Sequence, residues 1–357
     1  LDAAATSQET SDLSAFPPEV SSERGHFSRV DVQTDYVDYL YSLVDLADSR
    51  PLRVVVDAGN GMGGLSAPAV LQAGRAPIEM IGLYLELDGT FPHHEPNPLD
   101  PANLIDLGRA VRHHGADLGL AFDGDADRCF VVDELGDPVS ASVISALVAT
   151  EEIAAEIRRG VPAHEITVVH NSVTSRALPE AIAATGARPI LAKVGHVYIK
   201  QAMAAHRAIF GAEHSGHYYF RDFWYADTGM LMALRVIAAL GTAPGTPTFS
   251  EFVAGHQGYC ESGEVNFVVA DSAAAAADVL AWGRDQDGAL QVDHVDGLSM
   301  LSISANDQFW SVSLRASNTE PLLRLNVEAD DAISMHRVLD ALADLVRRHE
   351  APGCQQQ

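Results

Sequence analysis

Positive charge is scarce in this sequence. Among its 357 residues, 23 are Lys or Arg and 49 are Asp or Glu, which gives a formal net charge of −26. Lysine occurs only at Lys193 and Lys200. Nucleic acids and anionic membranes attract basic surfaces, so both are poor partners for this chain. A small anionic ligand would need local positive charge, which makes each cation close to a motif informative.

Cysteine is also scarce, and long apolar runs are missing. Cys129, Cys260 and Cys354 are scattered without the spacing of a metal site, which argues against a disulfide framework and predicts a reducing, cytoplasmic location. No apolar run reaches the length of a transmembrane helix. The start lacks the basic and then apolar segments of a secretory signal. We therefore expect neither secretion nor a membrane partner.

The most informative stretch of the sequence is acidic. Asp123, Asp125 and Asp127 alternate with small residues and are followed by Arg128. Apolar runs on both sides predict two buried strands joined by a tight loop. Three neighbouring carboxylates repel one another unless a cation neutralises them, and hard divalent cations prefer oxygen ligands. We predict a Mg²⁺ site, because three protein oxygens leave positions open for a phosphate oxygen.

Two other interpretations fit the acidic loop less well. With Glu134 at the twelfth position the spacing approaches an EF-hand loop, but Arg128 stands where that loop needs glycine. The flanking runs also indicate strands rather than helices, so we reject the EF-hand. An ordinary solvated acidic turn is the remaining alternative, and the apolar flanks together with the motifs described next count against it.

Strands and helices alternate along most of the chain, which predicts the α/β class. We expect two consecutive mixed-sheet α/β domains followed by a small α+β C-terminal domain with three antiparallel strands. The expected divisions are a linker or remnant of a first domain at 1–34, α/β domains at 35–138 and 139–247, and the α+β domain at 248–357.

Two glycine-containing segments could bind an anionic sugar. Glu213, Ser215 and His217 alternate in the segment GAEHSGHYYF, so on an extended strand they would point the same way. A carboxylate and a hydroxyl can bind sugar hydroxyls, and a histidine can transfer protons. Lys193 and His196 flank a glycine turn that opens a predicted helix, where a lysine and the helix N-terminus suit an anion. The alternatives are a polar strand end and a surface lysine with a capping histidine.

A polar turn between two predicted C-terminal strands, RASNTEP, has the composition of a phosphate cradle. Arg315 offers a planar guanidinium group that can bind two phosphate oxygens. Ser317, Asn318 and Thr319 add side-chain donors, and the backbone of the turn adds N–H groups. The alternative is an ordinary polar turn without a ligand.

These segments, in their order, resemble signatures of the α-D-phosphohexomutase family, most closely its phosphomannomutase/phosphoglucomutase branch. The signatures are DAGNGMGG, DGTFPHHEPNP, FDGDADR, GAEHSGH and RASNTEP, and the resemblance covers residues 35–348. DAGNGMGG also follows a strand and opens a helix, as a dinucleotide-binding turn would. It lacks the G-x-G-x-x-G register, so we interpret it as tight packing of a strand against a helix.

The resemblance implies a cleft to which successive domains contribute a metal loop, a sugar loop and a phosphate loop. It implies that the three aspartates bind Mg²⁺ and that Arg128 helps to position the phosphoryl group. The implied sugar ligands are Glu213 and Ser215. The residues implied to contact substrate or assist proton transfer are Lys193, His196 and His217. The residues implied to hold the non-transferring phosphate are Arg315, Ser317, Asn318 and Thr319.

The implied activity is that of a phosphohexomutase. Such an enzyme is an isomerase that interconverts the 1-phosphate and 6-phosphate of a hexose, here mannose or glucose, through a bisphosphorylated sugar. The family's first domain carries a phosphoserine in a loop similar to Thr-Ala-Ser-His-Asn-Pro, and this sequence contains no Ser-His-Asn. Because the sequence starts with leucine, we expect a fragment that lacks the first domain and is inactive alone. A natural truncation is the alternative.

Two further functions remain open from the sequence. One is a non-catalytic protein that binds sugar phosphates through the same loops. A weaker one is a Mg²⁺-dependent phosphatase in which water attacks in place of the missing serine. The sequence does not distinguish between mannose, glucose and glucosamine phosphates, because the residues of the sugar loop suit each of them.

Overall fold

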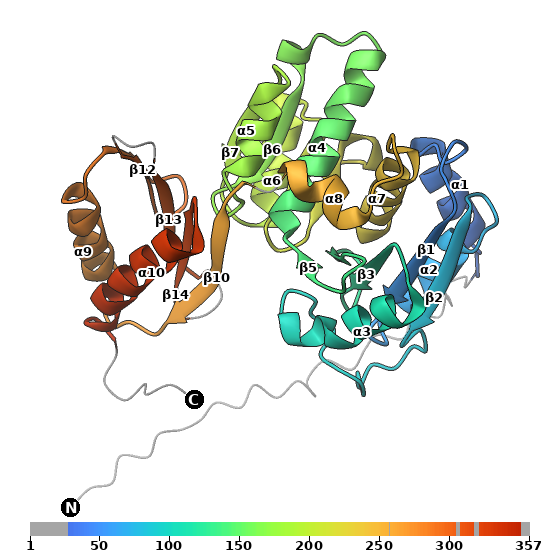
Figure 1. The fold of residues 1–357 in the computed structure, drawn as a ribbon, viewed down its shortest axis with the longest axis horizontal. Helices are drawn as coiled ribbons and strands as arrows, with labels where there is room; N and C mark the ends of the chain where they lie inside the picture. Colours follow the sequence, from blue (N-terminus) through green and yellow to red (C-terminus); the bar gives the residue numbers. More distant parts are fainter. Residues whose placement is uncertain (1–27, 257, 305–307, 318–320, 351–357) are drawn as a thin grey trace, which may run out of the picture.

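The structure, a computed structural model, describes residues 28–256, 258–304, 308–317 and 321–350. Three β-sheets follow one another along the chain, each accompanied by helices (Figure 1). The first two sheets are mixed and the third is antiparallel, so the predicted fold class is confirmed. Across the described part of the chain, no helix has both the length and the apolar composition needed to span a bilayer.

The first sheet has the strand order β2-β1-β3-β4-β5. Its strands are β1 (Leu52–Asp57), β2 (Ile78–Leu83), β3 (Leu118–Phe122), β4 (Cys129–Val132) and β5 (Pro138–Val139), and its helices are α1 (Gln33–Leu43), α2 (Gly63–Leu71) and α3 (Ile105–His114). Strand β1 runs parallel to β2 and β3, whereas β3, β4 and β5 are antiparallel. All residues of β3 and β4 are buried, which explains their continuous apolar runs. The carboxyl ends of β1 and β3 therefore share one edge.

The second sheet has the order β7-β6-β8-β9. Its strands are β6 (Thr167–Asn171), β7 (Arg188–Ala192), β8 (Phe210–Ala212) and β9 (Tyr218–Phe220), and its helices are α4 (Ala141–Arg158), α5 (Ala177–Ala184), α6 (His196–His206) and α7 (Gly229–Thr242). One hydrophobic core contains Leu120 of the first sheet, Phe210 of the second, and Ile144 and Leu234 of the helices between them. This continuous core fixes the first two sheets relative to each other.

The C-terminal sheet has five strands in the order β10-β14-β13-β12-β11, where the sequence predicted three. They are β10 (Cys260–Phe267), β11 (Ala289–Asp293), β12 (Leu298–Ile303), β13 (Phe309–Ala316) and β14 (Leu323–Ala329), with helices α9 (Ser272–Arg284) and α10 (Ala332–Arg347). A register shift between Glu261 and Glu264 interrupts the alternation in β10, and β11 is a largely exposed edge strand. Neither strand therefore has the apolar pattern of a half-buried strand.

Helix α8 (Phe249–Val253) helps to locate the boundary between the second unit and the C-terminal unit. Its Phe249 and Val253 are buried in the core of the first two sheets, with α4 and α7, whereas the C-terminal sheet has a separate core. We therefore propose that the division lies after α8 rather than at residue 247.

A buried carboxylate docks the C-terminal sheet onto the second unit. Glu328 of β14 accepts hydrogen bonds from the Ser175 hydroxyl and from the Arg176 N–H (3.2 Å), just before α5. Ser311 on the neighbouring strand donates to the same carboxylate (3.2 Å). Burial raises the pKa of Glu328 to about 7. The C-terminal unit is thus held here by polar contacts and not by a shared apolar core.

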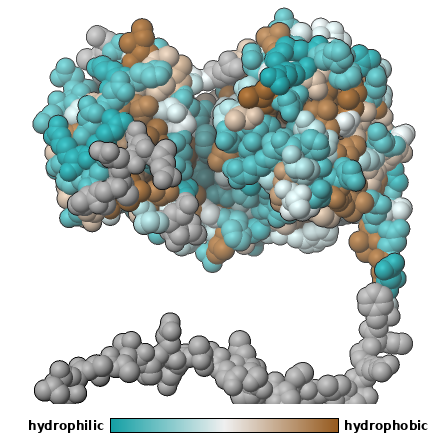
Figure 2. All heavy atoms as spheres, turned by 90° about the horizontal axis from the view of Figure 1, so that it is seen from below, coloured by the Kyte–Doolittle hydropathy of each residue, from teal (hydrophilic) through white to brown (hydrophobic). Residues whose placement is uncertain are grey.

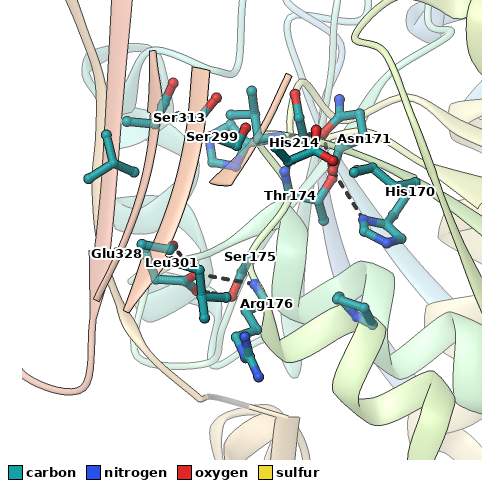
Figure 3. Close-up of a pocket in the computed structure, with 18 of the residues that line it drawn as sticks. His170, Asn171, Thr174, Ser175, Arg176, His214, Ser299, Leu301, Ser313 and Glu328 are labelled. Carbon is teal, nitrogen blue, oxygen red and sulfur yellow. Dashed lines mark hydrogen bonds between the residues drawn. The ribbon is translucent and has the colours of Figure 1, made fainter. Parts of the chain in front are cut away.

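A cavity of about 540 Å³ lies beside this contact, between the polar face of the C-terminal sheet and the second unit (Figure 3). Its lining includes Asn171, Thr174, His214, Ser299, Ser313 and Glu328. Seen from below, the surface is hollowed between the C-terminal unit and the rest of the molecule (Figure 2). The junction is therefore less tightly packed than the continuous core of the first two sheets.

We expect Glu328→Gln to flatten the pH dependence of stability between pH 4.5 and 7. Because the folded pKa of about 7 exceeds the ordinary 4.5, the folded state binds more protons in this window. The protonated Glu328 carboxyl group contributes at most about 3 kcal/mol to the free energy of unfolding. This contribution is complete below pH 4.5 and is lost as the pH rises through 7. Glutamine keeps an acceptor oxygen without the charge. Urea unfolding at pH 5 and pH 8, followed by tryptophan fluorescence, measures the difference.

Glu86→Gln provides a control, since it removes an exposed carboxylate in the loop after β2, in the first unit. This variant should keep the pH dependence of the unmodified protein. An unchanged pH dependence in Glu328→Gln would contradict the role of the buried carboxyl group.

Candidate active site

The acidic loop joins β3 to β4, as the sequence predicted. The two strands are antiparallel, with Phe122 opposite Cys129, so the intervening residues form a tight hairpin loop. Carboxylate oxygens of Asp123, Asp125 and Asp127 all lie within 4.8 Å of one another. Their environments differ, because Asp123 is buried and Asp125 is exposed. The loop thus offers a converging set of oxygen ligands on one side of the hairpin.

The electrostatics of this loop suit a divalent cation. Burial, together with the neighbouring Asp123 and Asp125, raises the pKa of Asp127 to about 7. The buried Oδ1 atom of Asp127 has no hydrogen-bond partner in the described part of the chain, and His217 Nε2 lies 3.6 Å away. A hard cation with oxygen ligands would satisfy this atom and offset the repulsion. The residues present therefore fit a bound metal ion.

Arg128 is held rigidly at the end of the loop. Its Nε donates to Asp123 Oδ2 (2.7 Å), and its backbone N–H donates to Oδ1 of the same carboxylate (3.1 Å). Its Nη1 donates to the Asn97 side-chain oxygen (3.3 Å). Because Asp123 is buried, this ion pair is largely removed from water and keeps the guanidinium group in one orientation.

The glycine-rich turn after β1 supports the acidic loop from behind. The Met62 N–H donates to the Gly124 carbonyl oxygen (2.9 Å), and a Cβ atom on Gly61 would lie 2.5 Å from that oxygen. Asp57 at the end of β1 is buried, which raises its pKa, and its carboxylate contacts His94 (3.1 Å). The prediction of tight strand–helix packing for DAGNGMGG is confirmed at Gly63, the first residue of α2, where a Cβ atom would lie 3.1 Å from Phe122 Cβ of β3. The additional contact of this turn with the acidic loop was not predicted from the sequence.

The segment GAEHSGHYYF (211–220), called the sugar loop below, is not a single extended strand. The prediction that Glu213, Ser215 and His217 alternate on one strand was therefore wrong. Gly216 adopts a left-handed conformation (φ +86°), and its N–H donates to the Glu213 carbonyl (3.1 Å). The Glu213 N–H donates in turn to the His217 carbonyl (3.0 Å), which closes a hairpin turn between β8 and β9. The reversal separates the side chains, because Glu213 turns inward while Ser215 Oγ and His217 Nδ1 lie 2.9 Å apart.

The Glu213 carboxylate links two motifs inside the protein. It is only 2% exposed and accepts hydrogen bonds from the Tyr219 hydroxyl (2.6 Å) and the Gly195 N–H (2.8 Å). Gly195 immediately precedes α6, which begins at His196 as the sequence predicted. Lys193 and His196 are exposed on this turn. Through these hydrogen bonds, Glu213 joins the sugar loop to the turn that contains Lys193.

The acidic loop and the sugar loop meet through their backbones. Arg128 and His217 form an isolated antiparallel bridge, and the Cys129 N–H donates to the Gly216 carbonyl (3.3 Å). Only glycine fits at position 216, since a Cβ atom there would lie 2.3 Å from the Phe130 ring. Two loops from different sheets are therefore adjacent, and the pKa of His217 is lowered by burial.

Asp227 and Lys200 lie where the acidic loop meets the sugar loop. The sequence analysis assigned neither residue a role. A ligand atom of Asp227 lies within 4.8 Å of those of Asp127 and His217, and Lys200 Nζ contacts the Asp227 carboxylate at 2.8 Å. The rarity of lysine in the chain was the one available signal for Lys200. No local pattern marks Asp227, because only the tertiary fold brings it to the loop.

The predicted phosphate turn lies between β13 and β14, as expected. Arg315 contacts Glu264 of β10 (3.0 Å), and Ser317 accepts a hydrogen bond from Arg324 (3.2 Å). Both of these contacts lie within the C-terminal unit. Asn318 and Thr319 lie outside the described residues.

The C-terminal unit does reach the Lys193 turn through Asp296, in the turn between β11 and β12. The Asp296 carboxylate accepts hydrogen bonds from the Val194 N–H (3.0 Å) and the Ser172 hydroxyl (3.3 Å). The C-terminal unit therefore contacts the Lys193 turn at Val194, and the next residue, Gly195, is hydrogen-bonded to Glu213.

Three family models match consecutive parts of the chain. Domain II of phosphoglucomutase/phosphomannomutase, an alpha/beta/alpha domain, matches residues 34–136, and domain III, of the same architecture, matches 144–257. The C-terminal domain of the same proteins matches 264–345. The chain belongs to the phosphoglucomutase/phosphomannomutase family. The resemblance drawn from the motifs is thus confirmed.

Relatives in this family cover nearly the whole chain. Phosphohexose mutases of Xanthomonas campestris pv. campestris is 40% identical over 321 residues, and phosphomannomutase of Salmonella montevideo is 38% identical over 328 residues. Both alignments cover 90% of this chain and 68% of the relative. A phosphoglucomutase/phosphomannomutase family protein of Burkholderia thailandensis has a crystal structure that matches with a TM-score of 0.74 at 28% identity, over 92% of this chain and 66% of that one. The chain thus spans 66–68% of the length of these relatives.

In this phosphoglucomutase/phosphomannomutase chain, we expect Gly61→Ala to weaken divalent metal binding. The added methyl group would displace the Gly124 backbone of the acidic loop, at a cost of roughly 1–3 kcal/mol of stability. Gly89→Ala is the matched control, because nothing lies within 4 Å of a Cβ atom at that position. Calorimetric titration with Mg²⁺ and thermal unfolding measure the two effects. Equal metal affinity in the two variants would contradict the supporting role of the Gly61 turn.

Proposed function

We propose that this chain supplies the metal, sugar and phosphate sites of a phosphohexomutase that interconverts hexose 1-phosphate and hexose 6-phosphate, with mannose or glucose phosphate as substrate. The observation that carries the proposal is the backbone bridge between Arg128 and His217, which places a carboxylate cluster beside a histidine. Family membership and the names of the relatives support the substrate class. The scattered cysteines support a cytoplasmic location.

The acidic loop would bind Mg²⁺ through Asp123, Asp125 and Asp127 and receive the phosphoryl group to be transferred. When bound, Mg²⁺ would supply positive charge that stabilises the phosphoryl oxygens. Arg128 has five N–H donors on its guanidinium group, of which Nε and Nη1 already bind Asp123 and Asn97. The other donors would bind phosphoryl oxygens, and the fixed orientation of the group would lower the cost of organising the site.

His217 would accept a proton from the attacking sugar hydroxyl. Its burial lowers its pKa and thereby favours the neutral imidazole that a general base requires. Ser215 Oγ lies 2.9 Å from Nδ1, so a neutral imidazole protonated at Nδ1 would donate to Ser215 and keep its lone pair on Nε2, which lies 3.6 Å from Asp127. Lys193 and His196 would contact the substrate from the start of α6, where helix N–H groups also favour an anion.

Substrate recognition would be divided between the sugar loop and the phosphate turn. Ser215 would bind a sugar hydroxyl, and we propose that Glu213 acts together with it, chiefly by fixing the shape of the loop. The groups proposed to hold the non-transferring phosphate are Arg315, Ser317, Asn318 and Thr319. In an acidic protein, these local cations would offset the charge that otherwise repels an anionic substrate.

The sequence contains no Ser-His-Asn segment that could serve as the phosphoserine of the catalytic cycle. We therefore propose that the chain alone binds hexose phosphates without isomerising them, and that the phosphoserine comes from a segment outside this sequence. The same observation favours the second candidate function, a sugar-phosphate-binding protein that never catalyses the transfer. The two differ in whether a phosphoserine-bearing domain restores turnover.

We expect the chain to bind mannose 6-phosphate in the presence of Mg²⁺, and to leave mannose 1-phosphate unchanged in a ³¹P NMR assay supplied with a hexose 1,6-bisphosphate. Asp125→Asn should weaken Mg²⁺ binding about tenfold or more, because it removes one charged ligand from a site of three. Asp287→Asn removes the same charge from an exposed position in the C-terminal unit and should change nothing. Calorimetry measures both affinities.

Each result separates the possibilities. Isomerisation by the chain alone would contradict the need for a separate phosphoserine. Failure to bind any hexose phosphate would contradict the proposed function as a whole. Binding without turnover, even after a phosphoserine-bearing domain is added, would favour the binding protein.

A further inference from the structure

The cavity beside Glu328 lies against one face of the C-terminal sheet (Figure 3). The opposite face carries the apolar core, in which Met300, Val312 and Leu325 pack with α9 and α10. Because neighbouring residues of a strand point to opposite faces, the alternate positions of β12, β13 and β14 face the cavity. Among the described residues, none with a role in the proposed function lines it. The cavity therefore contains polar groups that the metal, sugar and phosphate sites leave unexplained.

Two carboxylates, called the carboxylate pair below, are neighbours in the wall of this cavity. Glu261 of β10 and Glu328 of β14 are direct cross-strand partners, and like charges in this position destabilise a sheet unless a cation compensates them. Their hydrogen-bond donors are neutral serine hydroxyls and one backbone N–H. Within the described ranges, the one side-chain nitrogen at ion-pair distance is His214 Nδ1, 3.5 Å from Glu261 Oε2. The pair is therefore short of positive charge. In agreement, burial raises the pKa of Glu328 to about 7, and Glu261 adds to this shift.

A row of polar atoms on the same face of the sheet, called the acceptor row below, lacks partners. Ser299, Ser313 and Asn326 occupy adjacent positions on β12, β13 and β14, and all three line the cavity. Ser313 is only 6% exposed. The buried atoms Ser299 Oγ, Ser313 Oγ and Asn326 Oδ1 have no hydrogen-bond partner in the described part of the chain. Hydroxyl and amide oxygens can all accept hydrogen bonds, so a ligand with N–H donors would satisfy the whole row.

The charge and size of the cavity select the kind of ligand. The carboxylates of its lining are Glu180, Glu261, Asp293 and Glu328, whereas Arg176 is its one arginine or lysine and already binds Glu180. This excess of negative charge repels an anion such as a sugar phosphate. The described groups that could hold a single metal ion lie elsewhere, at and beside the acidic loop. A volume of about 540 Å³ instead suits a small organic molecule.

We propose that this cavity is a binding site for a small organic cation, an aliphatic diamine or polyamine. One ammonium group would lie at the carboxylate pair and supply the missing positive charge. A second would donate to the acceptor row, since each ammonium group has three N–H donors and no acceptor. The methylene chain between them would contact apolar lining residues such as Leu301. The bound cation would touch both the C-terminal sheet and the second unit, and would therefore stabilise the folded protein.

The test is calorimetric titration of the chain with putrescine and with spermidine, with Mg²⁺ in excess so that the acidic loop is occupied. 1,4-Butanediol, which has the length of putrescine without its charges, should bind about tenfold more weakly or less. Glu261→Gln should weaken putrescine binding about tenfold, because it removes one charge and keeps an acceptor oxygen, and Ser313→Ala should weaken it several-fold. Asp340→Asn removes an exposed charge on α10 and should bind as the unmodified chain does.

Thermal unfolding without any amine separates ligand binding from a structural role. Ser313→Ala should keep or raise the Tm, because it removes a buried hydroxyl that has no partner. A lower Tm would mean that the protein itself satisfies this hydroxyl, and would overturn the proposal. This variant also carries the binding test if Glu261→Gln does not fold.

Three binding results would overturn the proposal as well. Failure of both amines to bind would leave water as the occupant of the cavity. Equal weakening by Glu261→Gln and Asp340→Asn would indicate non-specific attraction of amines to an acidic surface. Binding of 1,4-butanediol as tight as that of putrescine would identify a site for neutral polyols instead of cations.

Discussion

The structure depends on the backbone contact between the acidic loop and the sugar loop. Each loop on its own is a short hairpin turn, and the pairing of Arg128 with His217 joins the two. This pairing requires glycine at position 216, where any side chain would strike the Phe130 ring. The carboxylate cluster therefore has a histidine neighbour from a different sheet, and burial lowers the pKa of that histidine.

The interior of the protein explains why this contact is stable. The first two sheets share one continuous core, so their loops cannot shift independently without breaking apolar packing. Asp123 fixes Arg128 to this core, because its buried carboxylate binds both the backbone and the side chain of Arg128. The acidic loop is thus part of the folded framework rather than a flexible surface segment.

The C-terminal unit is attached differently. Its own core lies on the helix side of the sheet, and its polar face meets the rest of the protein through the carboxylates of Glu328, Glu261 and Asp296. A cavity remains between the two surfaces. The strands that flank the predicted phosphate turn therefore belong to a unit whose position depends on hydrogen bonds and charge.

The sequence alone determined the fold class, the acidic loop and the order of the motifs, because these depend on local patterns of apolar residues, glycines and charges. A prediction from local spacing was wrong where the tertiary structure imposed a different backbone conformation. Glu213, Ser215 and His217 alternate as on a strand, yet the left-handed Gly216 reverses the chain between them. Only the tertiary structure decided that Asp227 reaches Asp127 and that Arg324 faces Arg315, since such neighbours arise from strand register and helix packing.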